Sequence, residues 1–250
     1  MKSGISLCLL LVSSLMVKAA PPTPSAQSPL VQVTVEYIEV TQEEATRLLY
    51  KEKLGKDGAK LRAELQTMME SGRAKPFETL MASCKADQKT TSESVREVIY
   101  ATEYEPAGFP TTVAVEKQTA ATPDMVKALS SLVTPETPTA FETRSTGGTV
   151  ELEAVLSEDK KIIQLRLVPE LVIDTGVRKF NARKDAQGND LYIEMPLFYA
   201  IRFNTAADLS DGAPQLLALQ TPPGVDGAPD RRRKLMVIVT AEVVKPSPSK

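Results

Sequence analysis

Between Thr146 and Val172 the chain reads T-G-G-T-V-E-L-E-A-V-L-S-E-D-K-K-I-I-Q-L-R-L-V-P-E-L-V. Apolar and polar residues alternate on both sides of a polar turn at Ser157–Lys160. The apolar positions are Val150, Leu152, Ala154 and Leu156 before the turn, and Ile163, Leu165 and Leu167 after it. Alternation with a period of two on either side of a turn predicts a β-hairpin with one buried face.

The rest of the chain adds strands and two helices to this hairpin. Residues 31–40, 77–84, 94–104, 191–203, 215–220 and 234–244 have strand-like patterns. The polar turn Ala86–Lys89 between the second and third of these predicts another hairpin. Thr41 and Glu44 form a capping-box pattern that begins one helix, and a second helix is predicted over Ala59–Glu70.

These patterns predict an α+β fold rich in strands. Residues 31–140 form an α/β half, and residues 141–245 form a half of antiparallel β-hairpins. Within the first half, residues 106–138 are rich in proline and predict an irregular connection. It has room for one edge strand at Val113–Val115 and one short helix at Met125–Leu132. Together, residues 31–245 are predicted to be one core domain.

The first residues predict export. Residues 1–19 contain Lys2, an apolar run and a Val17-Lys18-Ala19 cleavage pattern, which are typical of a secretory signal peptide. Residues 20–30 are a linker rich in proline and serine, and residues 246–250 are a tail. Loss of the leader would leave Cys84 as the one remaining cysteine, which we expect to be a structural thiol.

The composition argues against catalysis. The 250 residues include no histidine, so the commonest general base and the commonest zinc ligand are missing. Asp208-Leu209-Ser210-Asp211-Gly212 lacks the later acidic ligands of a calcium loop and is interpreted as a turn. We therefore expect no enzyme activity, no cofactor and no metal.

The charge pattern argues against a nucleic-acid partner. The formal net charge is −2, whereas nucleic-acid binders normally carry a basic face. The basic run Arg231–Lys234 is interpreted as a solvated turn that enters a strand, with a membrane-surface patch as the alternative. Alternating strands also leave two architectures open: a sheet that covers a soluble core, or a barrel with one face in lipid.

Five blocks of sequence, in this order, resemble the bacterial secretins, the ring-forming outer-membrane channels of type II and type III secretion and of type IV pilus systems. The blocks are V-Q-V-T-V-E-Y-I-E-V-T (31–41), R-E-V-I-Y-A-T-E-Y-E-P (96–106), the hairpin 146–172, M-P-L-F-Y-A-I-R-F-N-T-A-A-D-L-S-D-G-A (195–213) and K-L-M-V-I-V-T-A-E-V-V (234–244). The residues that carry the family pattern are Glu39, Tyr100, Tyr104, Pro106, Gly147, Pro169, Glu170, Pro196, Phe198, Asp211 and Gly212.

The resemblance implies a short, divergent secretin that carries only the core domain. It would be a non-catalytic subunit of an outer-membrane secretion or pilus channel, with other copies of itself or other secretion and pilus components as partners, in a Gram-negative bacterium. Two departures favour an alternative, a soluble periplasmic accessory or binding module. Only a linker precedes Val31, and Leu217–Thr221 replaces the glycine pair that commonly follows Asp-Gly in the family. For Tyr100 and Tyr104 we expect a packing role.

Overall fold

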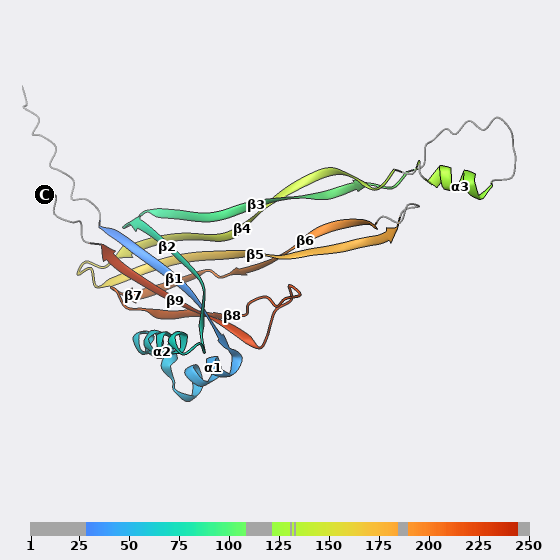
Figure 1. The fold of residues 1–250 in the computed structure, drawn as a ribbon. Helices are drawn as coiled ribbons and strands as arrows, with labels where there is room; N and C mark the ends of the chain where they lie inside the picture. Colours follow the sequence, from blue (N-terminus) through green and yellow to red (C-terminus); the bar gives the residue numbers. More distant parts are fainter. Residues whose placement is uncertain (1–28, 109–121, 131, 133, 185–189, 245–250) are drawn as a thin grey trace, which may run out of the picture.

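The computed structural model describes residues 29–108, 122–130, 132, 134–184 and 190–244. Within these residues the chain forms two antiparallel β-sheets with a layer of short helices on one side (Figure 1). The strand-rich α+β prediction is confirmed. The predicted signal peptide, nearly all of the linker, Val113–Val115 and the tail lie outside the described residues.

The first sheet brings the two ends of the described chain together. Its strand order is β2 (Lys75–Lys85), β1 (Leu30–Thr41), β9 (Arg233–Val244) and β8 (Gln215–Gln220). The β1–β9 ladder runs without interruption from the pair Leu30–Val244 to the pair Thr41–Arg233. The two central strands of this sheet therefore come from opposite ends of the chain.

The second sheet contains the hairpin that the sequence predicts. Its order is β3 (Lys89–Glu105), β4 (Thr137–Leu156), β5 (Ile162–Lys184) and β6 (Asp190–Arg202). A further strand, β7 (Thr205–Ser210), pairs with the first part of β5, and β6 pairs with the rest. Strand β5 changes its partner on this side from β7 to β6, and Pro169 lies at the point of change. Proline suits this position because it has no N–H to donate to a ladder.

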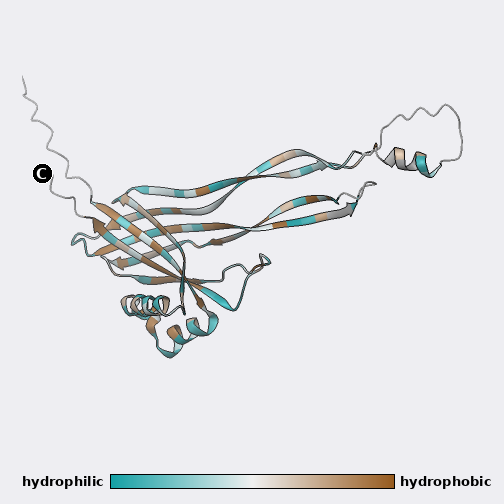
Figure 2. Cartoon of the chain, in the orientation of Figure 1, coloured by the Kyte–Doolittle hydropathy of each residue, from teal (hydrophilic) through white to brown (hydrophobic). Residues whose placement is uncertain are grey.

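Two hydrophobic cores hold the layers together. One lies between the sheets and includes Val33, Tyr37, Leu165 and Leu167. The other lies between the first sheet and the helices. Strand β9 serves both cores, because Leu235, Val237, Val239 and Ala241 face the second sheet, whereas Met236 and Ile238 face the helices. Figure 2 shows hydrophobic residues concentrated in this two-sheet base.

The helical layer follows β1 and is capped as its sequence predicts. It consists of α1 (Gln42–Thr46), a π-helical turn (Arg47–Lys51), a 3₁₀ turn (Leu54–Lys56) and α2 (Gly58–Glu70). A further helix, α3 (Pro123–Ser130), lies apart from this layer, on the connection between β3 and β4 (Figure 1). The Thr41 hydroxyl accepts a bond from the Glu44 N–H at 3.1 Å, and Asp57 caps α2 in the same way. The Glu44 carboxylate pairs with arginines instead of closing the capping box.

An ion-pair network joins the helices to one another. Arg47 contacts the carboxylates of Glu44 at 2.6 Å, of Glu64 at 3.4 Å and of Glu52, and Arg73 reaches Glu44 at 3.3 Å. The hydrogen bond from Arg47 holds the pKa of Glu44 below its ordinary value, against the opposing effect of burial. The charged form of Glu44 therefore stabilises this layer.

We expect Glu44→Gln to make stability less dependent on pH. Because the pKa of Glu44 is lower in the folded chain, its contribution is present above the unfolded value of about 4.3 and is lost as pH falls through the folded value. At pH 7 the variant should lose up to about 1 kcal/mol of unfolding free energy. Urea unfolding at pH 7 and at pH 3 measures the loss of unfolding free energy and its dependence on pH. Glu43→Gln is the control, because Glu43 has no ion pair among the described residues; an equal loss at both pH values contradicts the assignment.

Most predicted elements are found, with one wrong pairing. The predicted hairpin across Ala86–Lys89 is wrong: β2 pairs with β1 in the first sheet, and β3 pairs with β4 in the second. The turn carries the chain from one sheet to the other, with Asp87 at φ 65° and its N–H bonded to the Ala154 carbonyl at 2.9 Å. The expected boundary at residue 140 falls inside β4, and each sheet takes strands from both sides of it.

Candidate functional site

Two β-hairpins extend beyond the two-sheet base, and we call them the arms (Figure 1). The first arm consists of residues 95–105 of β3 and 137–146 of β4. The second consists of residues 173–184 of β5 and 190–199 of β6. The β4–β5 ladder ends at the pair Gly147–Val172, and we call this point the fork. Past the fork, the described parts of the two arms are not joined by backbone pairing.

The arms differ from the base in what they expose. Each arm strand pairs with one neighbour, so each arm carries unpaired strand edges among the described residues. Several large apolar side chains are also exposed there: Val95, Ile99, Phe141, Val177, Phe180, Tyr192, Met195 and Leu197. Unpaired edges together with exposed apolar residues are typical of a surface that another strand or subunit covers.

The arms touch each other through side chains. The Tyr100 and Phe198 rings lie with their centroids 5.7 Å apart, tilted by 56°. The Arg144 guanidinium lies over the same Phe198 ring at 5.7 Å. The Tyr104 hydroxyl lies 3.5 Å from the Glu194 carbonyl oxygen. The structure thus brings Tyr100 of β3 together with Phe198 of β6, two residues that are distant in the sequence.

Glycines shape the fork. Gly147 has φ 122°, and a Cβ there would lie 2.3 Å from the Ser94 carbonyl oxygen. A Cβ on Gly148 would lie 2.4 Å from the Leu80 side chain, across the space between the sheets. These positions need glycine because backbone and core approach closely where β4 leaves the base.

The loop between β8 and β9 braces the second arm near the fork. The Tyr199 hydroxyl donates to the Thr221 carbonyl at 2.9 Å, and Gly227 lies against Thr175. At the end of this loop, Arg233 donates to Glu39 at 2.7 Å, to Asp230 at 2.8 Å and to the Pro223 carbonyl. The predicted turn into a strand at the basic run is confirmed, because β9 begins at Arg233.

The remaining family-pattern residues are spread over the fold. The Glu170 carboxylate lies 3.9 Å from Arg202, and Pro196 borders a bulge in the β5–β6 ladder. Asp211 accepts a bond from the Val243 N–H at 2.8 Å, and Gly212 has φ 71°. The turn predicted over residues 208–212 is only partly right, because residues 208–210 belong to β7 and the turn begins at Asp211. Pro106 is exposed just past β3.

These residues therefore form several small structural clusters. Sequence reasoning missed Arg144 and Glu194 as neighbours of the aromatic residues, and no local pattern identifies them.

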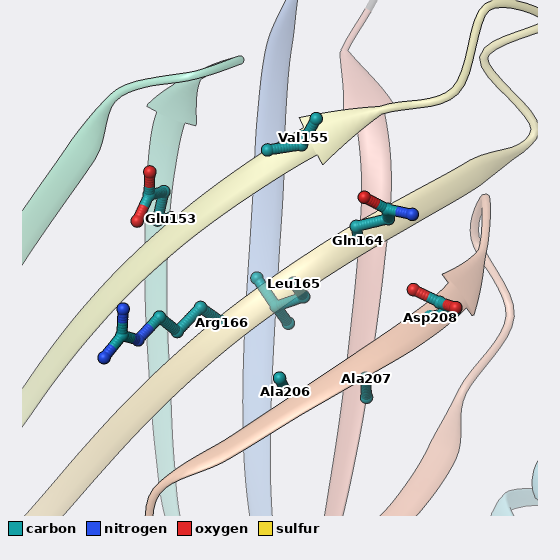
Figure 3. A pocket seen from close by; sticks show the side chains of 8 residues that line it. All are labelled: Glu153, Val155, Gln164, Leu165, Arg166, Ala206, Ala207 and Asp208. Carbon is teal, nitrogen blue, oxygen red and sulfur yellow. The ribbon is translucent and has the colours of Figure 1, made fainter.

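A shallow groove of about 470 Å³ lies on the outer face of the second sheet (Figure 3). Arg166 of β5 lies between Glu153 of β4 and Ala206 of β7 in the ladder. Gln164 and Asp208 continue the same face, whereas Leu165 points through the sheet into the core. Ligand pockets are usually deeper and mostly apolar, so this open groove with mixed charge does not define a small-molecule site.

Three observations bear on chemistry and membranes. Among the described residues there is no group of three or more histidine, cysteine or acidic side chains arranged to hold a metal ion. Cys84 is buried, and burial raises the pKa of its thiol. Within the described part of the chain, no helix combines the length and the apolar character needed to span a membrane.

Comparisons of sequence and of structure give different results. No family model and no curated protein matches the sequence. Solved structures of secretins do match. The InvG secretin of the Salmonella SPI-1 type III injectisome is 10% identical, with a TM-score of 0.41, and the match covers 89% of this chain and 67% of that one. In the structure of the Salmonella SPI-1 basal-body proteins InvG, PrgH and PrgK, the match spans 48% of the matched chain.

Two further matches come from other systems. The type II secretin GspD of enteropathogenic Escherichia coli is 10% identical with a TM-score of 0.42, covering 88% of this chain and 70% of that one. The type IV competence pilus secretin PilQ of V. cholerae is 12% identical with a TM-score of 0.29, covering 88% and 58%. Each is a secretin, the family that the sequence resembles.

Proposed function

We propose that this chain is a non-catalytic subunit of a ring in the cell envelope, part of a secretion or pilus channel. The observation that carries the proposal is the pair of arms, with long unpaired strand edges and exposed apolar side chains. Natural proteins usually shorten, charge or cover such edges, because they template pairing with other strands. Strand pairing with a partner would cover them here.

Another copy of the same chain is the simplest partner. A single chain carries two different arms, so pairing the first arm of one copy with the second arm of the next is a head-to-tail contact. Repeated head-to-tail contacts close into a ring when the rotation permits. The five sequence blocks that resemble secretins support the same assembly, and the predicted leader supports a location in the outer membrane or periplasm.

The alternative is a soluble periplasmic module that keeps this fold without a pore. The contact between Tyr100 and Phe198 favours this alternative, because each arm covers an aromatic ring of the other arm within one chain. The two functions predict different states of the protein, a large multimer or a monomer.

We expect the tagged protein to run as a multimer on unheated gels of the outer-membrane fraction. Ile99, 68% exposed on β3, should lie in the contact between copies, so Ile99→Lys should reduce the multimer about tenfold. Tyr50→Lys is the matched control, because Tyr50 is 76% exposed in the helical layer, away from the arms. A wild-type monomer released by osmotic shock contradicts the ring and supports the periplasmic module.

A further inference from the structure

We propose that the contacts around Phe198 form a latch between the arms, and that the latch must open before copies of the chain assemble. The latch consists of Phe198 and Glu194 on the second arm and Tyr100, Tyr104 and Arg144 on the first. This inference rests on the proposed ring function and adds a step that controls when the ring forms.

Phe198 is the centre of the latch because both strands of the first arm reach it. Tyr100 comes from β3 and Arg144 from β4, each at 5.7 Å from the ring. A tilted aromatic pair and a cation over a ring face are both attractive arrangements. Arg96 of β3 adds an ion pair to Asp174 of β5 at 3.4 Å, nearer the fork.

The latch is weak enough to open. Its residues are exposed or partly exposed and lie outside both hydrophobic cores. The described parts of the arms share no backbone ladder beyond Gly147–Val172, so side chains alone hold them together. The Arg96–Asp174 pair is largely exposed, so solvent and salt screen it, and the Phe198 contacts carry most of the attraction.

The latch controls assembly because of the strands that it joins. Two-stranded ribbons twist strongly, and beyond the fork β3 and β6 approach each other across the gap between the arms (Figure 1). These are the outer strands of the second sheet. While Tyr100 packs on Phe198, one unpaired edge of each arm, on β3 and on β6, faces into the gap and is closed to a neighbouring copy.

Removing the latch should speed assembly. In pulse-labelled cells we expect Phe198→Ala to form the unheated-gel multimer about fivefold to tenfold faster than wild type. Tyr100→Ala should give the same gain from the other arm, and the double variant should gain little more, because both changes remove one contact. Tyr50→Ala is the control: Tyr50 is 76% exposed in the helical layer, away from the arms, and makes no ring contact among the described residues, so its loss should leave the rate unchanged.

A covalent lock tests the opposite direction. Tyr104→Cys with Glu194→Cys places two thiols at facing positions of the arms, well beyond the fork, and a short bismaleimide should join them, while buried Cys84 stays unmodified. The locked chain should assemble at least about tenfold more slowly than the same variant without reagent. Phe198→Ala should also lower the yield of the cross-link, because open arms hold the two thiols further apart.

The outcomes separate the latch from the ring. Equal rates for Phe198→Ala, Tyr50→Ala and wild type, or assembly of the locked chain at the unlocked rate, overturn the latch and leave the ring intact. Absence of a multimer from wild type and every variant overturns the ring and, with it, control of assembly by the latch. Faster assembly of both latch variants together with a blocked locked chain supports both.

Discussion

Replacing Gly147 by alanine is expected to lower the free energy of unfolding by about 2–4 kcal/mol. Two costs add at this position. The backbone has φ 122°, a conformation that residues with a Cβ rarely adopt. The new Cβ would also lie 2.3 Å from the Ser94 carbonyl oxygen and 3.0 Å from the Val95 Cα, so the β3–β4 ladder would have to shift at the fork.

Gly176→Ala separates these two costs. Gly176 has φ 106°, but a Cβ there would meet nothing within 4 Å. The second variant should therefore show the backbone cost alone, about 1–2 kcal/mol. Urea unfolding of both variants gives the comparison, and Gly147→Ala should also slow assembly because it displaces the base of the first arm. Equal losses in the two variants would mean that the close approach to Ser94 is relieved without cost.

Local patterns predicted the elements well because their causes are local. Alternation around Ser157–Lys160 identified the parts of β4 and β5 that lie in the base, and the helical pattern over Ala59–Glu70 identified α2, where Leu61 and Leu65 are buried. Only one of the two hydrogen bonds of the predicted capping box forms, from the Glu44 N–H to the Thr41 hydroxyl. The other does not form because the Glu44 carboxylate pairs with Arg47 and Arg73. Arg47 is a local neighbour, three residues after Glu44, but Arg73 follows α2, and the local pattern gives no sign of that second partner.

Pairing between distant strands could not be predicted in the same way. The turn after β2 has the composition of a hairpin turn, which predicted that β2 pairs with β3. However, Leu80 and Ala82 of β2 are buried in the core between the sheets, and this burial requires β2 to pair with β1 instead. The resemblance singled out Tyr100 and Phe198 separately, but their contact depends on the twist of two arms. A short alternating sequence determines which residues share a face of the strand, but it does not determine which other strand pairs with it.

Alanine substitutions in the two cores are expected to weaken one and the same unfolding transition. Leu167 is fully buried between the sheets, and Leu61 is fully buried between α2 and the first sheet. Truncation of a buried leucine leaves a cavity and costs about 2–5 kcal/mol. Since β9 contributes side chains to both cores, loss of either core removes support from the strand that the other core also needs.

Thermal unfolding followed by circular dichroism and by intrinsic tyrosine fluorescence should give coincident transitions for Leu61→Ala and Leu167→Ala, both at lower midpoints than wild type. Leu219→Ala is the matched control: Leu219 is 40% exposed on β8, so its loss should cost well under about 1 kcal/mol. If Leu61→Ala instead split the unfolding into two steps, the helical layer would unfold on its own. The two-sheet base would then be a separate unit, able to hold the arms in place without the helices.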